Sequence, residues 1–139
     1  MSTSSAKTVN RLLWTAQSLA AALFLFAGSV KFIIPADKMQ SGPIVFPIAF
    51  IYFIGICECL GALGLLLPGL LRIRTSLTPL AAAGLTIIMV GATTVSVLAM
   101  GVAAGVFPAV VGIITAWIAY SRGRVMPLVE TPRRLLRVA

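Results

Sequence analysis

Apolar residues run along this chain in four long stretches, at residues 12–34, 46–67, 80–100 and 102–120. Each stretch has the roughly 18 or more residues that an α-helix needs to cross a ~30 Å hydrocarbon core. None of them alternates apolar and polar residues, as the ~10-residue strands of a membrane barrel do. Backbone groups in lipid must be hydrogen-bonded within their own segment, so we predict four transmembrane helices.

Helix-breaking residues separate these stretches. Pro35 follows the first, Pro68 ends the second and Gly101 stands between the third and fourth. The last connection is so short that its two helices must form a tight antiparallel hairpin. The predicted fold class is an all-α, integral membrane four-helix bundle of antiparallel spans with short loops. One transmembrane domain is expected over residues 1–121, followed by a basic cytoplasmic tail at residues 122–139.

The composition supports a membrane protein and narrows the chemistry. The chain has 139 residues, of which 60% are hydrophobic and 10% charged, whereas soluble domains carry about 25% charged residues. It contains no histidine, which excludes histidine-based catalytic triads and the HExxH zinc site. The residues therefore suggest no metal site and no required cofactor.

The charges are strongly unbalanced and unevenly placed. Eleven Lys and Arg face three Asp and Glu, for a formal net charge of +8. With four spans, only Lys31 and Lys38 fall on the side opposite the termini, so the positive-inside rule predicts that both termini are cytoplasmic. Topology and attraction to anionic lipids account for the basic excess. No nucleic-acid partner is expected, because no aromatic residues are interleaved with the basic ones.

Glu58 is the residue that most needs an explanation. It lies in the middle of the second stretch, within about 5 Å of the bilayer centre. An ionised carboxylate there costs roughly 2.5 to 3.5 kcal/mol, and protonating an ordinary carboxyl at pH 7 costs about 3.7 kcal/mol. The sequence leaves open whether Glu58 is neutral or paired. Either way it should face the bundle interior, as a packing anchor or as a catalytic acid or base.

Several polar residues could meet that carboxyl. Those expected at similar depth, or lining the same binding pocket, are Gln17, Lys31, Thr86, Thr93, Thr115 and Trp117. Lys31 lies roughly 10 to 16 Å from Glu58 in depth, so a direct salt bridge is not expected unless the helices are staggered. Lys31 would instead snorkel to the head groups or pair with Asp37. Gln17, Phe24 and Lys31 recur every seven residues, which suggests that this stripe faces the bundle.

Small residues and cysteines complete the predictions. Gly61 and Gly64, together with Gly84 and Gly91 on the third stretch, are expected to allow close helix contacts. Cys57 and Cys59 stand two residues apart, so their side chains point in opposite directions on a helix and cannot form a disulfide with each other. We expect both to act as small apolar residues.

Motifs in three stretches carry a family resemblance. They are Trp14-x-x-Gln17 and Gly28-x-x-Lys31-Phe32, then Gly55-x-x-Glu58-x-x-Gly61-Ala62-x-Gly64, then Leu77-Thr78-Pro79-Leu80. Over residues 12–121 the chain is similar to the DoxX-like family of small bacterial membrane proteins, named for a component of a thiosulfate:quinone oxidoreductase. The resemblance implies a four-helix bundle in the bacterial inner membrane, a quinone as a candidate ligand and an oxidoreductase as a candidate partner. Relatives often carry a histidine and charged residues after the third span, where this chain has Thr93-Thr94-Val95-Ser96-Val97.

Two classes of function follow. In the first, the protein is an accessory or small-molecule-binding subunit, alone or as a homo-oligomer, linked to membrane oxidoreductase or quinone chemistry. In the second, it is a membrane-embedded isomerase, cyclase or epoxide-opening enzyme for an apolar, isoprenoid-like substrate. Glu58 would then be the general acid or base and Gln17 or a threonine the orienting group. Asp37 could join such a site only if its loop folds back into the bundle mouth.

Overall fold

A computed structural model describes residues 3–129 of the chain. Four long helices dominate it, with one short helix and one π-helical turn, and the described residues contain no strand. In chain order the elements are α1 (Thr3–Ile33), α2 (Ala36–Met39), α3 (Ile48–Leu71), α4 (Leu77–Met100), α5 (Val102–Tyr120) and η1 (Ser121–Val125).

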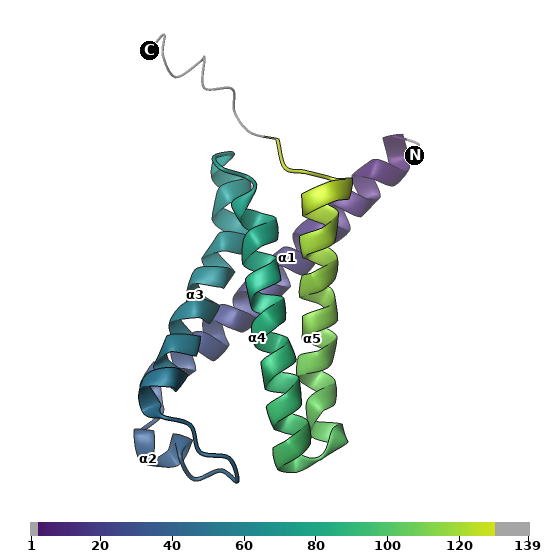
Figure 1. Cartoon of the computed structure of the whole chain (residues 1–139). Helices are drawn as coiled ribbons and strands as arrows, with labels where there is room; N and C mark the ends of the chain where they lie inside the picture. Colours follow the sequence, from purple (N-terminus) through teal and green to yellow (C-terminus); the bar gives the residue numbers. More distant parts are fainter. Residues whose placement is uncertain (1–2, 130–139) are drawn as a thin grey trace, which may run out of the picture.

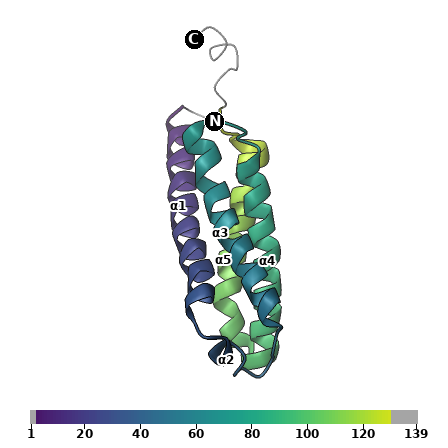
Figure 2. The same ribbon diagram turned by 90° about the vertical axis from the view of Figure 1, so that its left-hand side faces the viewer.

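The long helices run alternately up and down, so the start of α1 and the end of α5 lie at the same end of the bundle (Figure 1). We call this the terminal end; α2 and the α4–α5 turn lie at the other, distal end. Successive long helices pack on each other, α1 on α3, α3 on α4 and α4 on α5. The α1 helix is tilted across the others and touches α5 only lightly (Figures 1 and 2). This tilt decides which residues of α1 reach which neighbour.

All four predicted helices are confirmed, and three of them extend beyond their apolar stretch. The α1 helix begins nine residues earlier, at Thr3, because its polar first turns project from the bundle and need no apolar surroundings. The α4 helix begins at Leu77, with Pro79 in its first turn, where a missing backbone N–H costs no helical hydrogen bond. The prediction that Pro68 ends the second helix is wrong, since α3 continues through Pro68 to Leu71. Proline has no backbone N–H, so near the end of the helix it removes a single helical hydrogen bond.

The exterior of the bundle is as apolar as a membrane requires. Large side chains point outward from every long helix; Leu19, Phe26, Ile87 and Ile113 are each about two-thirds exposed or more. All four long helices are long and apolar enough to cross a membrane. The interior is filled by smaller groups around a few large ones such as Phe24 and Leu65. The protein is therefore a multi-pass membrane protein whose outer surface faces lipid.

Glycines allow close helix contacts on α3. A Cβ atom added at Gly61 would lie 2.6 Å from Leu85, and one added at Gly64 would lie 2.7 Å from Ala81. The prediction for these two positions is confirmed. For Gly84 and Gly91 it is wrong, since an added Cβ would meet nothing within 4 Å at either position. Those two glycines lie on the outward side of α4.

Candidate functional site

Lys31 and Glu58 form an ion pair between α1 and α3. The Lys31 Nζ atom lies 2.5 Å from Oε2 of Glu58. The Glu58 side chain is only 5% exposed, whereas that of Lys31 is 26% exposed. Glu58 therefore faces the bundle interior, as predicted, and its charge has a partner there. The expectation that these two residues would not form a direct salt bridge is wrong.

The helix register and the lean of the side chains explain this contact. Gly28 packs against Gly55 and Cys59, so Lys31 lies only about one turn, ~6 Å, beyond Glu58. Side chains tilt toward the start of their own helix. Because α1 and α3 are antiparallel, Lys31 and Glu58 lean toward each other. The Nζ of Lys31 also donates a 3.3 Å hydrogen bond to the carbonyl of Ala27, one turn back along α1.

The crossing of α1 and α3 is close beside this pair. A Cβ atom added at Gly28 would lie 2.7 Å from the carbonyl oxygen of Gly55 and 2.6 Å from Sγ of Cys59. Cys57 and Cys59 are both free and partly buried, in keeping with the prediction that they do not pair with each other. A tight backbone contact thus fixes the distance between α1 and α3 beside the ion pair.

Gln17 does not share a pocket with Glu58. Its Nε2 donates to the carbonyl of Leu65 at 2.7 Å, and its Oε1 accepts from Nε of Arg122 at 2.7 Å. Leu65 lies seven residues beyond Glu58 on α3, which is about 10 Å along the helix axis. The prediction that Gln17 shares a polar pocket with Glu58 is therefore wrong. Gln17 precedes Lys31 by about 21 Å along α1, so it meets α3 nearer the terminal end.

Arg122 is the residue that sequence reasoning missed. The sequence assigns it to the basic cytoplasmic tail at residues 122–139, but in the structure the residue is only 3% exposed and packs against the bundle. Its Nη1 donates to Oδ1 of Asn10 at 2.8 Å and to the carbonyl of Met126 at 3.3 Å, and its guanidinium carbon lies 5.5 Å from the ring centre of Trp14. The π-helical turn carries the chain past the end of α5 and folds this side chain inward. The signal in the sequence is the spacing of Asn10, Trp14 and Gln17, which form one polar face at the start of α1.

The predicted threonines serve the α4–α5 interface and not Glu58. The hydroxyls of Thr86 and Thr115 lie 2.9 Å apart, and each is within hydrogen-bond distance of a carbonyl of its own helix. Thr93 donates to the carbonyl of Met89 at 2.7 Å. Thr86 and Thr93 also line an open groove of about 360 Å³ between α4 and α5. Asp37 is exposed on α2 and does not fold back into the bundle.

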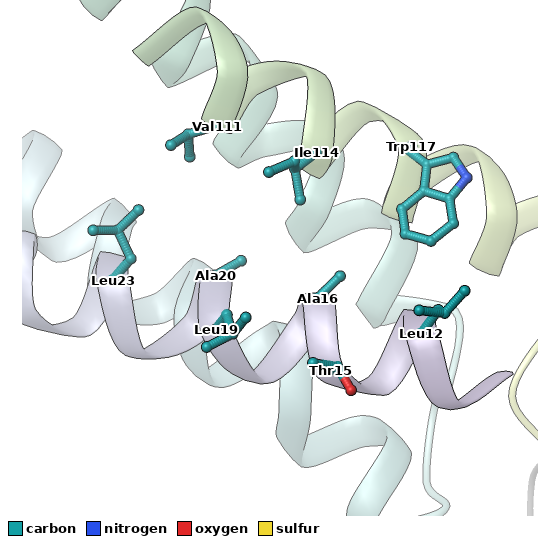
Figure 3. Close-up of a pocket in the computed structure, with 9 residues that line it drawn as sticks. All are labelled: Leu12, Thr15, Ala16, Leu19, Ala20, Leu23, Val111, Ile114 and Trp117. Carbon is teal, nitrogen blue, oxygen red and sulfur yellow. The ribbon is translucent and has the colours of Figure 1, made fainter. Parts of the chain in front are cut away.

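A second, more apolar groove runs between α1 and α5. Figure 3 shows the two helices facing each other, with Trp117 on α5 toward the terminal end. The volume is about 390 Å³. Ala16 and Ala20, four residues apart on α1, present small side chains toward α5, and this leaves the space. The lining residues are Leu12, Thr15, Ala16, Leu19, Ala20, Leu23, Val111, Ile114 and Trp117.

The predicted site residues therefore lie in separate parts of the bundle and do not form one common site. Glu58 and Lys31 form the ion pair, Gln17 supports Arg122, the threonines lie between α4 and α5, and Trp117 lines the groove beside α1. The pair and this groove lie on different sides of α1, since Lys31 faces α3 whereas the groove faces α5.

Comparison with known proteins identifies the family. The model of the DoxX-like family matches residues 15–118, which is most of the chain. No curated protein and no solved structure matched. The chain therefore belongs to the DoxX-like family, in agreement with its sequence motifs.

Proposed function

We propose that this DoxX-like protein is an accessory subunit that binds an apolar small molecule of the quinone type inside the bacterial inner membrane. The bound molecule would lie in the groove between α1 and α5, and the subunit would work beside a membrane oxidoreductase. The observation that carries this proposal is the groove itself. Its volume of about 390 Å³ is in the usual range for ligand pockets, about 300 to 1,000 Å³.

The chemistry of the groove suits an apolar ring or chain. Thr15 is the only lining residue with a hydroxyl, and that hydroxyl donates to the carbonyl of Arg11 at 3.0 Å. The ligand would therefore be held by shape and dispersion contacts more than by hydrogen bonds. Trp117, which is 41% exposed, offers a flat aromatic face to a quinone ring. The open side of the groove faces lipid, so a hydrophobic ligand could enter from the bilayer.

The enzyme alternative has less support from the geometry. Glu58 and Lys31 line neither the groove beside α1 nor the one beside α4. The carboxyl is also held in an ion pair, whereas a general acid must be free to give a proton to its substrate. We therefore assign the pair a structural part in the proposed function, positioning α1 against α3.

Quenching of tryptophan fluorescence tests the binding. The chain has two tryptophans, so a Trp14→Phe background leaves Trp117 as the only emitter. In vesicles, a short-chain quinone should quench Trp117 with a saturable dependence on its concentration. Ala16→Phe fills the groove and should weaken binding by about tenfold, the effect of losing ~1.4 kcal/mol of binding free energy.

Ala22→Phe is the matched control, because Ala22 is exposed on the same helix and does not line the groove. It should leave the quenching curve unchanged. Quenching that is linear in quinone concentration, or equal in the Ala16→Phe and Ala22→Phe variants, would show partition into lipid only and would refute the groove site. Turnover of an isoprenoid-like substrate by the purified chain that is lost in Glu58→Gln, with quinone binding intact, would favour the catalytic alternative.

A further inference from the structure

The buried guanidinium of Arg122 has no carboxylate partner among residues 3–129. Only two acidic residues lie in that part of the chain: Glu58 is paired with Lys31, and Asp37 is on α2 at the distal end. The hydrogen bonds that Arg122 does make are to neutral oxygens. Its Nη2 atom is buried without any hydrogen-bond partner. A buried positive charge in this state attracts an anion, because the interior screens it weakly.

A cavity that Arg122 itself does not line lies near this charge, on the terminal end of the bundle. Trp14 connects the two, since its ring faces the Arg122 guanidinium and also lines the cavity. The volume is about 440 Å³. A Cβ atom added at Gly69 would lie 2.9 Å from both Trp14 and Leu128, so this glycine keeps the cavity wall thin. The lining residues are Trp14, Gly69, Leu70, Arg72, Leu128 and Val129.

Arg72 supplies the cavity with its own positive charge. It is exposed, and its side chain makes no hydrogen bond or ion pair in the part of the chain that the structure describes. Its backbone is left-handed, with φ 53°, and so is that of Arg74, with φ 46°. At Arg72 this conformation ends α3, as a left-handed residue does at many helix C-termini. The end of α3 therefore places an arginine at the cavity.

We infer that this cavity binds a phosphate anion, the head group of an anionic phospholipid, with Arg72 as the contacting residue and the fixed charge of Arg122 behind Trp14. The apolar residues Leu70, Leu128 and Val129 would meet the first carbons of the lipid. Arg122 would attract the phosphate through its charge and would not touch it, because its Nη2 atom is buried. This site shares no lining residue with the groove between α1 and α5, so a failure of one proposal does not refute the other.

Lipid retention measures the inference directly. The full chain would be purified from vesicles of phosphatidylglycerol and phosphatidylcholine in equal parts, and bound lipid counted by native mass spectrometry. We expect one phosphatidylglycerol per chain to be retained in preference to phosphatidylcholine. Arg72→Gln should weaken that retention by about tenfold or more, as expected for one charge-assisted contact. Arg124→Gln removes the same charge from an exposed residue that does not line the cavity, and should have little effect.

Each outcome decides the inference. Equal weakening by Arg72→Gln and Arg124→Gln would reduce the effect to general surface charge and overturn the site, as would equal retention of the two lipids. Inorganic phosphate separates the two sources of the same chemistry. Protection against thermal unfolding by phosphatidylglycerol alone identifies the lipid, whereas protection by phosphate identifies a soluble anion at the same place. The Glu130 carboxylate of the same chain is the competing anion. If Glu130→Gln increases lipid retention while Arg72→Gln loses none, that carboxylate occupies the cavity and the lipid site is overturned.

Discussion

The ion pair between Lys31 and Glu58 should respond unequally to removal of its two partners. Lys31→Met leaves the Glu58 carboxyl, 5% exposed, without a partner near the middle of the membrane. Keeping it ionised there costs roughly 2.5 to 3.5 kcal/mol, and protonating it at pH 7 costs about the same, so we expect the free energy of unfolding to fall by about 3 kcal/mol.

Glu58→Gln should cost much less. The amide oxygen can still accept a hydrogen bond from Lys31. The Lys31 ammonium is also 26% exposed and within 3.3 Å of the Ala27 carbonyl, so it can turn outward toward the head groups. We expect a loss of about 1 kcal/mol, the value of one ordinary hydrogen bond. The double variant carries no charge at this contact between α1 and α3 and should be more stable than Lys31→Met alone.

Unfolding in mixed micelles of a mild detergent and sodium dodecyl sulfate measures these free energies. The informative quantity is the order of the three variants, since all are compared in the same medium. Our explanation of the ion pair fails if Glu58→Gln is as unstable as Lys31→Met, or if the double variant gains nothing over Lys31→Met. The first result would mean that the unpaired Lys31 ammonium cannot turn outward, and the second that Glu58 is stabilised by groups other than Lys31.

Three further predictions use other parts of the bundle. Gly61→Ala should lower the free energy of unfolding by about 1 to 3 kcal/mol through overpacking, because its Cβ would lie 2.6 Å from a side chain of α4. In the control Gly84→Ala, the added Cβ meets nothing within 4 Å, so that variant should be neutral or slightly stabilising. Equal losses of stability in thermal unfolding would contradict the packing of α3. Gln17→Leu leaves a buried carbonyl and the Arg122 Nε without partners, and should cost about 2 to 3 kcal/mol in the same assay; an unchanged stability would mean that water replaces the amide. A cysteine at Ser41, in a background without the native cysteines, should be labelled from outside the cell and one at Ser76 only from inside; the reverse pattern would invert the proposed topology.

The sequence by itself determined the architecture of this protein. Uninterrupted apolar stretches of at least 18 residues allow only helices in lipid, and the breaks at Pro35 and Gly101 decide where the chain turns. The burial of Glu58 followed in the same way, because the cost of a carboxyl facing lipid exceeds the cost of almost any arrangement inside the bundle. These conclusions depend on transfer free energies of single residues, which are properties of the sequence alone.

Which polar groups meet was decided only by the tertiary structure. The tilt and register of α1 bring Lys31 to Glu58 and carry Gln17 away to Arg122, and a shift of one helical turn would change both pairings. The π-helical turn that buries Arg122 has no apolar pattern to predict it. Periodicity shows which face of a helix is buried but not the depth at which it meets its neighbour. That depth depends on close contacts such as Gly28 against Gly55, where the absence of side chains lets two backbones set the register.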